Sequence, residues 1–165
     1  MAQSSWPFEN IDTTESQFSR WARNITEGVK GGPNTTELLV TGDDSGMQVR
    51  VAAGESMVRG HYYLNDSQAT VTLDTADLSN PRIDIIVLEL NPTANTILVK
   101  KVTGVVDPNP VAPQIVQTDA GIYQIELAKV QVDAGTTSII STDVSDTRIF
   151  MTAQNALNPF LLIGA

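Results

Sequence analysis

The sequence predicts a mainly β protein, an antiparallel β-sandwich or barrel of about eight or nine strands with one short N-terminal α-helix and an extended C-terminal tail. Three observations lead to this fold class. The chain has 165 residues, of which 41% are hydrophobic, so it is long enough to bury one core. From residue 37 onward, apolar and polar residues alternate in short segments. Turn residues separate these segments at intervals of about 8–12 residues, as in sandwiches and barrels.

The helix signal lies near the N-terminus. Thr14 and Gln17 match the two ends of a capping box, and Gly28 is a suitable C-terminal stop. The residues between them repeat at helical spacing and place four apolar side chains on one face: Phe18, Trp21, Ala22 and Ile25. An isolated helix of about three turns is marginal in water. We therefore expect this helix to pack against its own sheet or a neighbouring subunit.

The strands follow in order along the chain. We expect them at residues 47–53, 57–64, 69–73, 82–90, 97–102, 123–132, 136–140 and 144–149. Within the second of these, Gly60 indicates a bulge or the close approach of another backbone. Residues 82–90 and 97–102 predict a central hairpin, and a shift of the apolar phase between Leu127 and Val130 predicts a bulge. Pro108, Pro110 and Pro113 predict that residues 105–121 form a long surface loop.

This pattern divides the chain into three parts. Residues 1–33 form an N-terminal arm with the amphipathic helix, residues 34–150 form the β-sandwich domain, and residues 151–165 form a C-terminal interaction tail. The tail ends in a run of four large apolar residues: Phe160, Leu161, Leu162 and Ile163. Such a run is buried either in the protein's own core or against another subunit, because its exposure would promote aggregation.

Composition excludes several classes of function. The net charge of −9 and pI near 4.4 disfavour nucleic acid as a partner. Without cysteine, the chain has no thiolate for a metal site or a nucleophile, and His61 is its one histidine, too few for zinc. No apolar run approaches the roughly 20 residues that span a bilayer, and the N-terminal residues lack a secretory signal. We expect no enzyme, no cofactor and no membrane insertion.

A few residues leave alternatives open. His61 is interpreted as a structural or surface residue, since no nucleophile motif accompanies it. Asp43–Gly46 is the densest acidic cluster, and either a calcium site or a solvated turn accounts for it. The aromatic residues are either sugar-stacking platforms or core and interface residues: Trp6, Phe8, Trp21, Tyr62 and Tyr63.

Two pairs of opposite charges lie within strands. Arg82 and Asp84 share one face of a strand, and Asp146 and Arg148 share one face of another. One hypothesis is that the two pairs meet crosswise and lock the C-terminal strand, which would make the loss of one charge costly. The alternative is two unrelated surface pairs of little energetic weight.

Five short segments follow the helix in a recognisable order. They are residues 45–54 (SGMQVRVAAG), 58–63 (VRGHYY), 80–88 (NPRIDIIVL), 123–130 (YQIELAKV) and 143–148 (DVSDTR), with the proline-rich loop before the fourth. Their order and spacing over roughly residues 8–150 resemble the baseplate and tail-tip structural proteins of tailed bacteriophages. These include minor tail proteins and upper-baseplate or receptor-binding adaptor modules.

The resemblance implies a non-catalytic virion module in the distal tail, present in the host cytoplasm before assembly. It implies a homo-oligomer, expected to be a trimer, that links other tail or baseplate proteins. The alternative is a receptor-binding or carbohydrate-binding tail protein that contacts a host cell-surface glycan. We predict that the helix and tail make the interface, through Trp6, Phe8, Phe18, Trp21, Ile25, Phe160, Leu161, Leu162 and Ile163.

Overall fold

The computed structural model describes residues 12–24 and 26–151 as one helix and ten strands in three antiparallel sheets. The elements in chain order are α1 (Glu15–Ala22), β1 (Gly28–Val29), β2 (Val40–Thr41), β3 (Gln48–Val51), β4 (Gly54–Val58), β5 (His61–Asn65), β6 (Ala69–Thr72), β7 (Arg82–Asn91), β8 (Thr96–Val102), β9 (Tyr123–Val132), a short 3-10 helix η1 (Ser141–Asp143) and β10 (Val144–Asp146). The prediction of a mainly β fold is confirmed.

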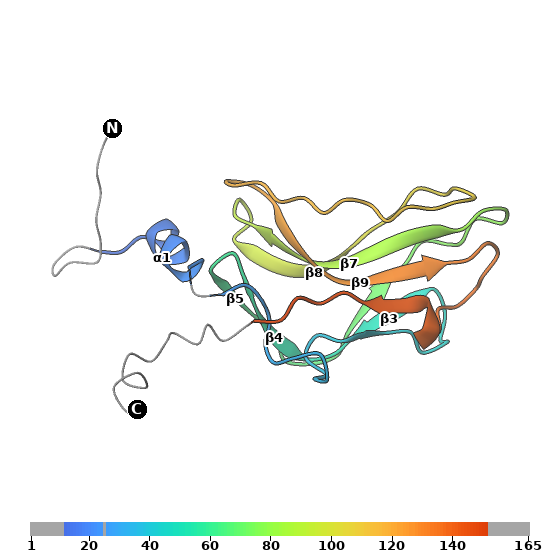
Figure 1. Ribbon diagram of the computed structural model, residues 1–165, viewed down its shortest axis with the longest axis horizontal. Helices are drawn as coiled ribbons and strands as arrows, with labels where there is room; N and C mark the ends of the chain where they lie inside the picture. The colour runs from blue at the N-terminus through green and yellow to red at the C-terminus, as the bar shows by residue number, and fades with distance from the viewer. Residues whose placement is uncertain (1–11, 25, 152–165) are drawn as a thin grey trace, which may run out of the picture.

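The sheets form two layers (Figure 1). One layer is the four-stranded sheet in the order β10-β9-β7-β8, and the other combines the sheets β1-β4-β5 and β2-β3-β6. The sheets remain open, so the arrangement is a sandwich rather than a closed barrel.

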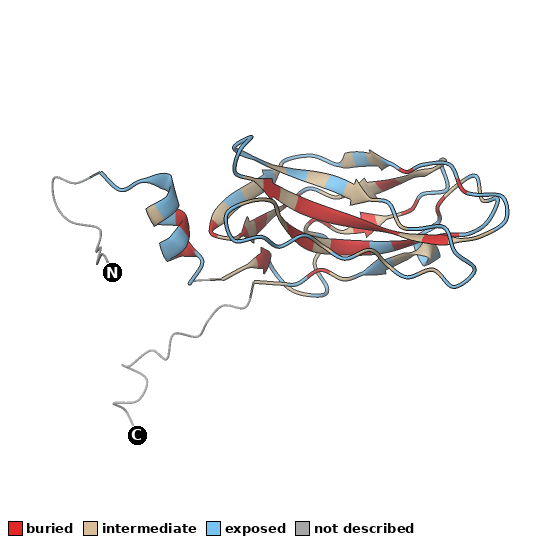
Figure 2. Ribbon diagram, turned by 90° about the horizontal axis from the view of Figure 1, so that it is seen from above, coloured by how far each residue is buried: buried red, intermediate tan, exposed pale blue. Residues whose placement is uncertain are grey.

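The core lies between the layers and is built from alternate residues of the facing strands. Val49 and Val51 of β3 and Val58 of β4 come from one layer, and Ile86 and Leu88 of β7 from the other. All five side chains are fully buried. Figure 2 shows the buried residues concentrated along the strands that cross the middle of the sandwich.

Strands β7 and β9 form the longest pair, and β9 contains the predicted bulge. Ile86 pairs with Ala128 whereas Val87 pairs with Glu126, so Leu127 is the extra residue. The bulge lets both Leu127 and Ala128 be buried on one strand, which is the phase shift visible in the sequence. The predicted hairpin of residues 82–90 and 97–102 is also confirmed, as β7 and β8.

The proline-rich loop covers the outer face of the four-stranded sheet. It passes over this sheet on the side away from the other layer (Figure 1) and is held by hydrogen bonds from Asp107 N to Pro81 O and from Gln124 N to Val116 O. Ile85 and Val87 are fully buried, although they alternate with β7 residues that face the core. Strand β7 is therefore covered on both faces.

Two of the predicted strands are wrong: one is a hairpin of two strands in the structure, and the other is not a strand. Residues 57–64 do not form one strand, because the chain reverses at Arg59 and Gly60 to make the hairpin of β4 and β5. Residues 136–140 form no strand, since Ile139 instead exchanges backbone hydrogen bonds with the turn at residues 44–46.

The helix has the predicted start but ends early. Thr14 caps it, and both hydrogen bonds of the capping box with Gln17 are present. It ends at Ala22, one residue before its C-cap Arg23, rather than continuing to Gly28. Gly28 instead begins β1, so the sheets already include residues from the range 1–33 that the sequence assigned to the arm. Among the described residues, no helix is long enough and apolar enough to cross a membrane.

Candidate functional site

A groove lies between α1, the edge strand β5 and the β7–β8 turn. It has two adjoining lobes of about 290 and 250 Å³, and the residues common to both are Glu15, His61, Leu90, Pro92 and Asn95. We call it the helix groove. Ligand sites are typically about 300–1,000 Å³, so the two lobes together are in the size range of a small-molecule site.

The β4–β5 turn positions one wall of the helix groove. Arg59 and Gly60 both have positive φ, of 49° and 77°, and they join the paired residues Val58 and His61. Two successive positive φ angles are typical of the type I′ hairpin turn. The turn lies so close to α1 that a Cβ on Gly60 would overlap the carbonyl oxygen of Ser19. Glycine at position 60 therefore lets the helix dock on the sandwich.

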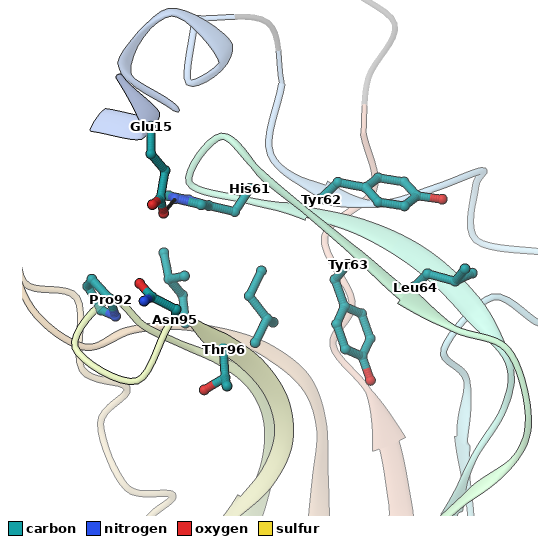
Figure 3. Close-up of a pocket in the computed structure, with 10 residues that line it drawn as sticks. Glu15, His61, Tyr62, Tyr63, Leu64, Pro92, Asn95 and Thr96 are labelled. Atoms are coloured by element: carbon teal, nitrogen blue, oxygen red, sulfur yellow. Dashed lines mark ion pairs between the residues drawn. The ribbon is translucent and has the colours of Figure 1, made fainter. Parts of the chain in front are cut away.

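His61 and Glu15 connect strand β5 to the helix. The distance from His61 Nε2 to Glu15 Oε1 is 3.4 Å, and His61 Nδ1 lies 3.2 Å from Arg59 O. Figure 3 shows these two side chains meeting above Pro92 and Asn95 of the β7–β8 turn. The histidine thus lies at the point where the two lobes join.

Two arginines and one carboxylate form the charged end of the groove. Asp119 accepts hydrogen bonds from Arg59 Nη2 through its carboxylate and, at 2.9 Å, through its backbone oxygen. Arg23 Nη1 lies 4.0 Å from the same carboxylate. Burial lowers the pKa of Arg23, and the positive charge of Arg59 lowers it further. The two cations are therefore close enough to repel each other and share a single acidic partner.

Arg59 is held firmly by its neighbours. Its side chain is only 13% exposed, and its guanidinium carbon lies 4.7 Å from the centre of the Tyr123 ring. Glu27 accepts a hydrogen bond from the Arg59 backbone N–H at 3.0 Å and another from the Tyr123 hydroxyl at 3.1 Å. Burial raises the pKa of Tyr123, with a further contribution from the negative charge of Glu27. Among the described residues, no hydrogen-bond partner meets the buried Nε of Arg59.

The aromatic residues of α1 face outward. Phe18 is 58% exposed and Trp21 is 55% exposed, with 5.8 Å between their ring centres. The buried face consists of Ser19 and Ala22. Of the two expected ways to cover Phe18 and Trp21, burial against the protein's own sheet is therefore wrong, and contact with a neighbouring subunit stays a prediction. Only small side chains fit between the helix and the closely approaching turn at Gly60. The remaining predicted interface residues lie outside the described residues: Trp6, Phe8, Ile25, Phe160, Leu161, Leu162 and Ile163.

The crosswise ion-pair hypothesis is wrong. Arg82 pairs with Asp84 at 3.0 Å and Arg148 with Asp146 at 2.6 Å, each within its own segment. Within the described part of the chain, neither arginine forms an ion pair with the aspartate of the other segment. The physical reason is that each guanidinium is already occupied by the aspartate two residues away and by backbone oxygens, of Thr75 for Arg82 and of the distant Thr35 for Arg148.

The acidic segment Asp43–Gly46 forms a turn. Asp43 accepts a hydrogen bond from Ser45 N at 3.1 Å and forms an ion pair with Arg50 at 2.9 Å. Asp44 has a positive φ of 60° and accepts from the Ser138 hydroxyl. In the ranges that the structure describes, no three His, Cys, Asp or Glu side chains are grouped as metal ligands.

The aromatic residues of β5 are separated by the pleat of the strand. In Figure 3, the side chains of Tyr62 and Tyr63 leave β5 in different directions, and Tyr63 extends toward the other layer. Tyr62 is 58% exposed, and Tyr63 packs against the core. Tyr63 is therefore a partly buried residue at the core and Tyr62 a largely exposed one, and both contribute to the lining of the larger lobe.

Sequence reasoning missed the charged end of the helix groove. Arg23, Arg59 and Asp119 are far apart in the chain, and no local pattern joins them. The one available signal is the Arg59-Gly60 pair, which is compatible with a two-residue hairpin turn.

Comparison of the chain with protein-family models, curated proteins and solved structures finds no match.

Proposed function

We propose that this protein is a structural component of a tailed-phage virion, a minor tail, baseplate or tail-tip protein that assembles as a homotrimer and links other tail proteins. The observation that carries the proposal is the outward aromatic face of α1. Phe18 and Trp21 are each more than half exposed on a helix whose opposite face is fixed to the sandwich. Large aromatic residues of this kind are the usual anchors of protein interfaces.

The resemblance of the ordered segments supports the same proposal. The segment of residues 58–63 forms the turn that docks α1, and residues 80–88 and 123–130 lie in the paired strands β7 and β9. The segments thus contribute to the framework that presents the helix. A rigid framework with an exposed anchor is suited to a subunit that is completed by its neighbours.

Two measurements test the proposed function. Native mass spectrometry of the full chain should give three times the 17.8 kDa mass of one chain. Gold-labelled antibodies to the chain should mark the distal tail of phage particles propagated in the host from which the gene was taken. A strictly monomeric chain together with unlabelled particles would contradict the proposal.

Carbohydrate binding is the second candidate, and the helix groove favours it. The groove combines apolar surfaces of Leu90 and Pro92 with polar side chains such as Asn95 and His61. Sugar rings present both hydroxyl groups and apolar C–H faces, so a mixed lining of this kind is suited to them. Equilibrium dialysis of the full chain against labelled monosaccharides tests this second candidate.

A further inference from the structure

The helix groove gathers two arginines in a protein whose net charge is −9, and its lining also contains two carboxylates; the four residues are Arg23, Arg59, Glu15 and Asp119. Elsewhere, each of seven cationic residues has a carboxylate partner of its own: Lys30, Arg50, Arg82, Lys100, Lys101, Lys129 and Arg148. Arg23 and Arg59 differ, because both depend on Asp119. An anionic group that displaces Asp119 would therefore meet two cations, while the remaining carboxylate of the groove, Glu15, lies 3.4 Å from His61.

The side chain of Asp119 indicates that the two arginines accept a carboxylate. Its side chain is 97% exposed, so a loop carboxylate reaches the two arginines from the solvent side. Arginine guanidinium groups bind carboxylates through paired, charge-assisted hydrogen bonds. Because the Asp119 side chain is exposed, a carboxylate of a ligand can replace it without burying the displaced charge.

The rest of the groove is suited to a sugar ring. Next to the arginines, the lobe that contains Asp119 is also lined by Ser16, and the adjoining lobe by Thr96 and Ile97. Hydroxyl and amide side chains from three separate elements thus surround a short apolar surface. A peptide of acidic residues would use the arginines but would leave most of these hydroxyl groups without a specific partner.

We propose that the helix groove binds an acidic saccharide unit, a pyranose whose carboxylate pairs with Arg23 and Arg59 in place of Asp119. This inference rests on the carbohydrate-binding candidate above and adds the class of ligand and the residues that select it. Ring hydroxyls would lie along the side chains of His61 and Asn95.

The test compares two sugars that differ at one carbon. Glucuronate and glucose are titrated separately into the full-length protein, and binding is followed by the backbone amide NMR shifts of Arg59, Gly60 and Gly121. We expect glucuronate to shift these amides at about 10 mM and glucose to bind at least about tenfold more weakly. A peptide of three glutamates serves as the acidic protein probe.

Three variants locate the site. Arg23→Gln should weaken glucuronate binding about tenfold, whereas the control Arg20→Gln on the same helix, outside the groove lining, should stay within about twofold. Asp119→Asn should strengthen binding several-fold, because it removes the competing carboxylate. Arg23 is partly exposed, but its Nε also donates to Arg59 O at 3.3 Å, so the amide spectrum of the unbound Arg23→Gln protein serves as the check that α1 stays docked. The Asp119→Asn result does not depend on an arginine variant.

Each other outcome overturns the inference. Equal binding of glucose and glucuronate would reject the acidic ligand but leave carbohydrate binding in place. Absence of binding by either sugar would reject both. Tighter binding of the glutamate peptide would assign the groove to an acidic protein surface, and weaker glucuronate binding by Asp119→Asn would show that Asp119 belongs to the site rather than occupying it.

Discussion

Arg148 connects two distant parts of the chain, residues 146–150 and 35–37, through one buried side chain. Its guanidinium binds both carboxylate oxygens of Asp146, at 2.9 and 2.6 Å, and donates to the backbone oxygens of Thr35 and Glu37. It also lies 4.9 Å from the centre of the Phe150 ring. The segment it holds leads into Leu38, a fully buried residue with a positive φ of 52°. Arg148 thus holds the backbone just before Leu38, whose positive φ is a strained conformation for a leucine.

Replacing Arg148 should be costly. Arg148→Gln leaves two backbone oxygens and the Asp146 carboxylate without their donors, so we expect the free energy of unfolding to fall by about 3 kcal/mol. The control is Lys129→Gln, which removes a long ion pair of 3.9 Å from a side chain that is 45% exposed and should cost under about 1 kcal/mol. Urea unfolding at pH 7 measures both. Similar losses for the two variants would contradict the role given to Arg148.

Asp146 should make stability depend on pH. Hydrogen bonds from the Arg148 side chain lower the pKa of Asp146 below its ordinary value. The stabilising contribution of an aspartate with a lowered folded-state pKa is complete above its unfolded-state pKa of about 4 and is lost as the pH falls through the folded-state pKa. We therefore expect Asp146→Asn to reduce stability at pH 7 and to have a much smaller effect below about pH 2. Urea midpoints of both proteins across this range provide the measurement, and an effect independent of pH would contradict the assignment.

At the scale of elements, the contact between α1 and the β4–β5 turn depends on Gly60. Its φ of 77° favours glycine, and the carbonyl of Ser19 occupies the space that a side chain would need. The helix has eight residues, too few to be stable alone in water. Its order therefore depends on this contact, which is the first of the two expected supports for the helix, its own sheet or a neighbouring subunit.

A matched pair of alanine substitutions isolates the docking contact. Gly135 also has a positive φ, of 69°, but a Cβ there would meet nothing within 4 Å. Gly135→Ala should cost about 1–2 kcal/mol from backbone strain alone. Gly60→Ala should cost more and should release α1, seen as faster amide hydrogen exchange in residues 15–22. Unchanged exchange of the helix in Gly60→Ala would show that the contact does not hold it.

The sequence was informative where a local pattern determines the structure. The capping box at Thr14, the β7–β8 hairpin and the bulge at Leu127 each follow from residues that are neighbours in the chain or in one strand. The outward orientation of Phe18 and Trp21 does not follow from the local pattern. It depends on the close contact of the helix with Gly60, which is distant in the sequence. The helix groove was missed for the same reason, since Glu15, Arg59 and Asp119 are brought together only by the fold.

At the scale of the whole molecule, the exposed aromatic pair should control assembly. We expect the double variant Phe18→Ser, Trp21→Ser to form oligomers more weakly, by about tenfold or more in dissociation constant. Its thermal stability should change little, because both side chains are largely exposed. Sedimentation velocity over a range of concentrations measures the association.

A matched surface substitution controls for general loss of apolar area. Leu78 is 87% exposed and lies outside the helix, so Leu78→Ser should leave association unchanged. If the wild-type chain and the aromatic double variant associate equally strongly, α1 is not part of the interface.

The first strand, β1, lies beside residues 149–151, which follow the last described strand, β10. Val29 N donates to Ile149 O at 2.7 Å and Met151 N to Val29 O at 2.8 Å, in a parallel arrangement near α1 (Figure 1). A pulling force applied between residue 28 and residue 151 would load these hydrogen bonds in shear, so that they must break together rather than open one by one. A chain pulled through both of these segments would accordingly resist tension before its core is disturbed.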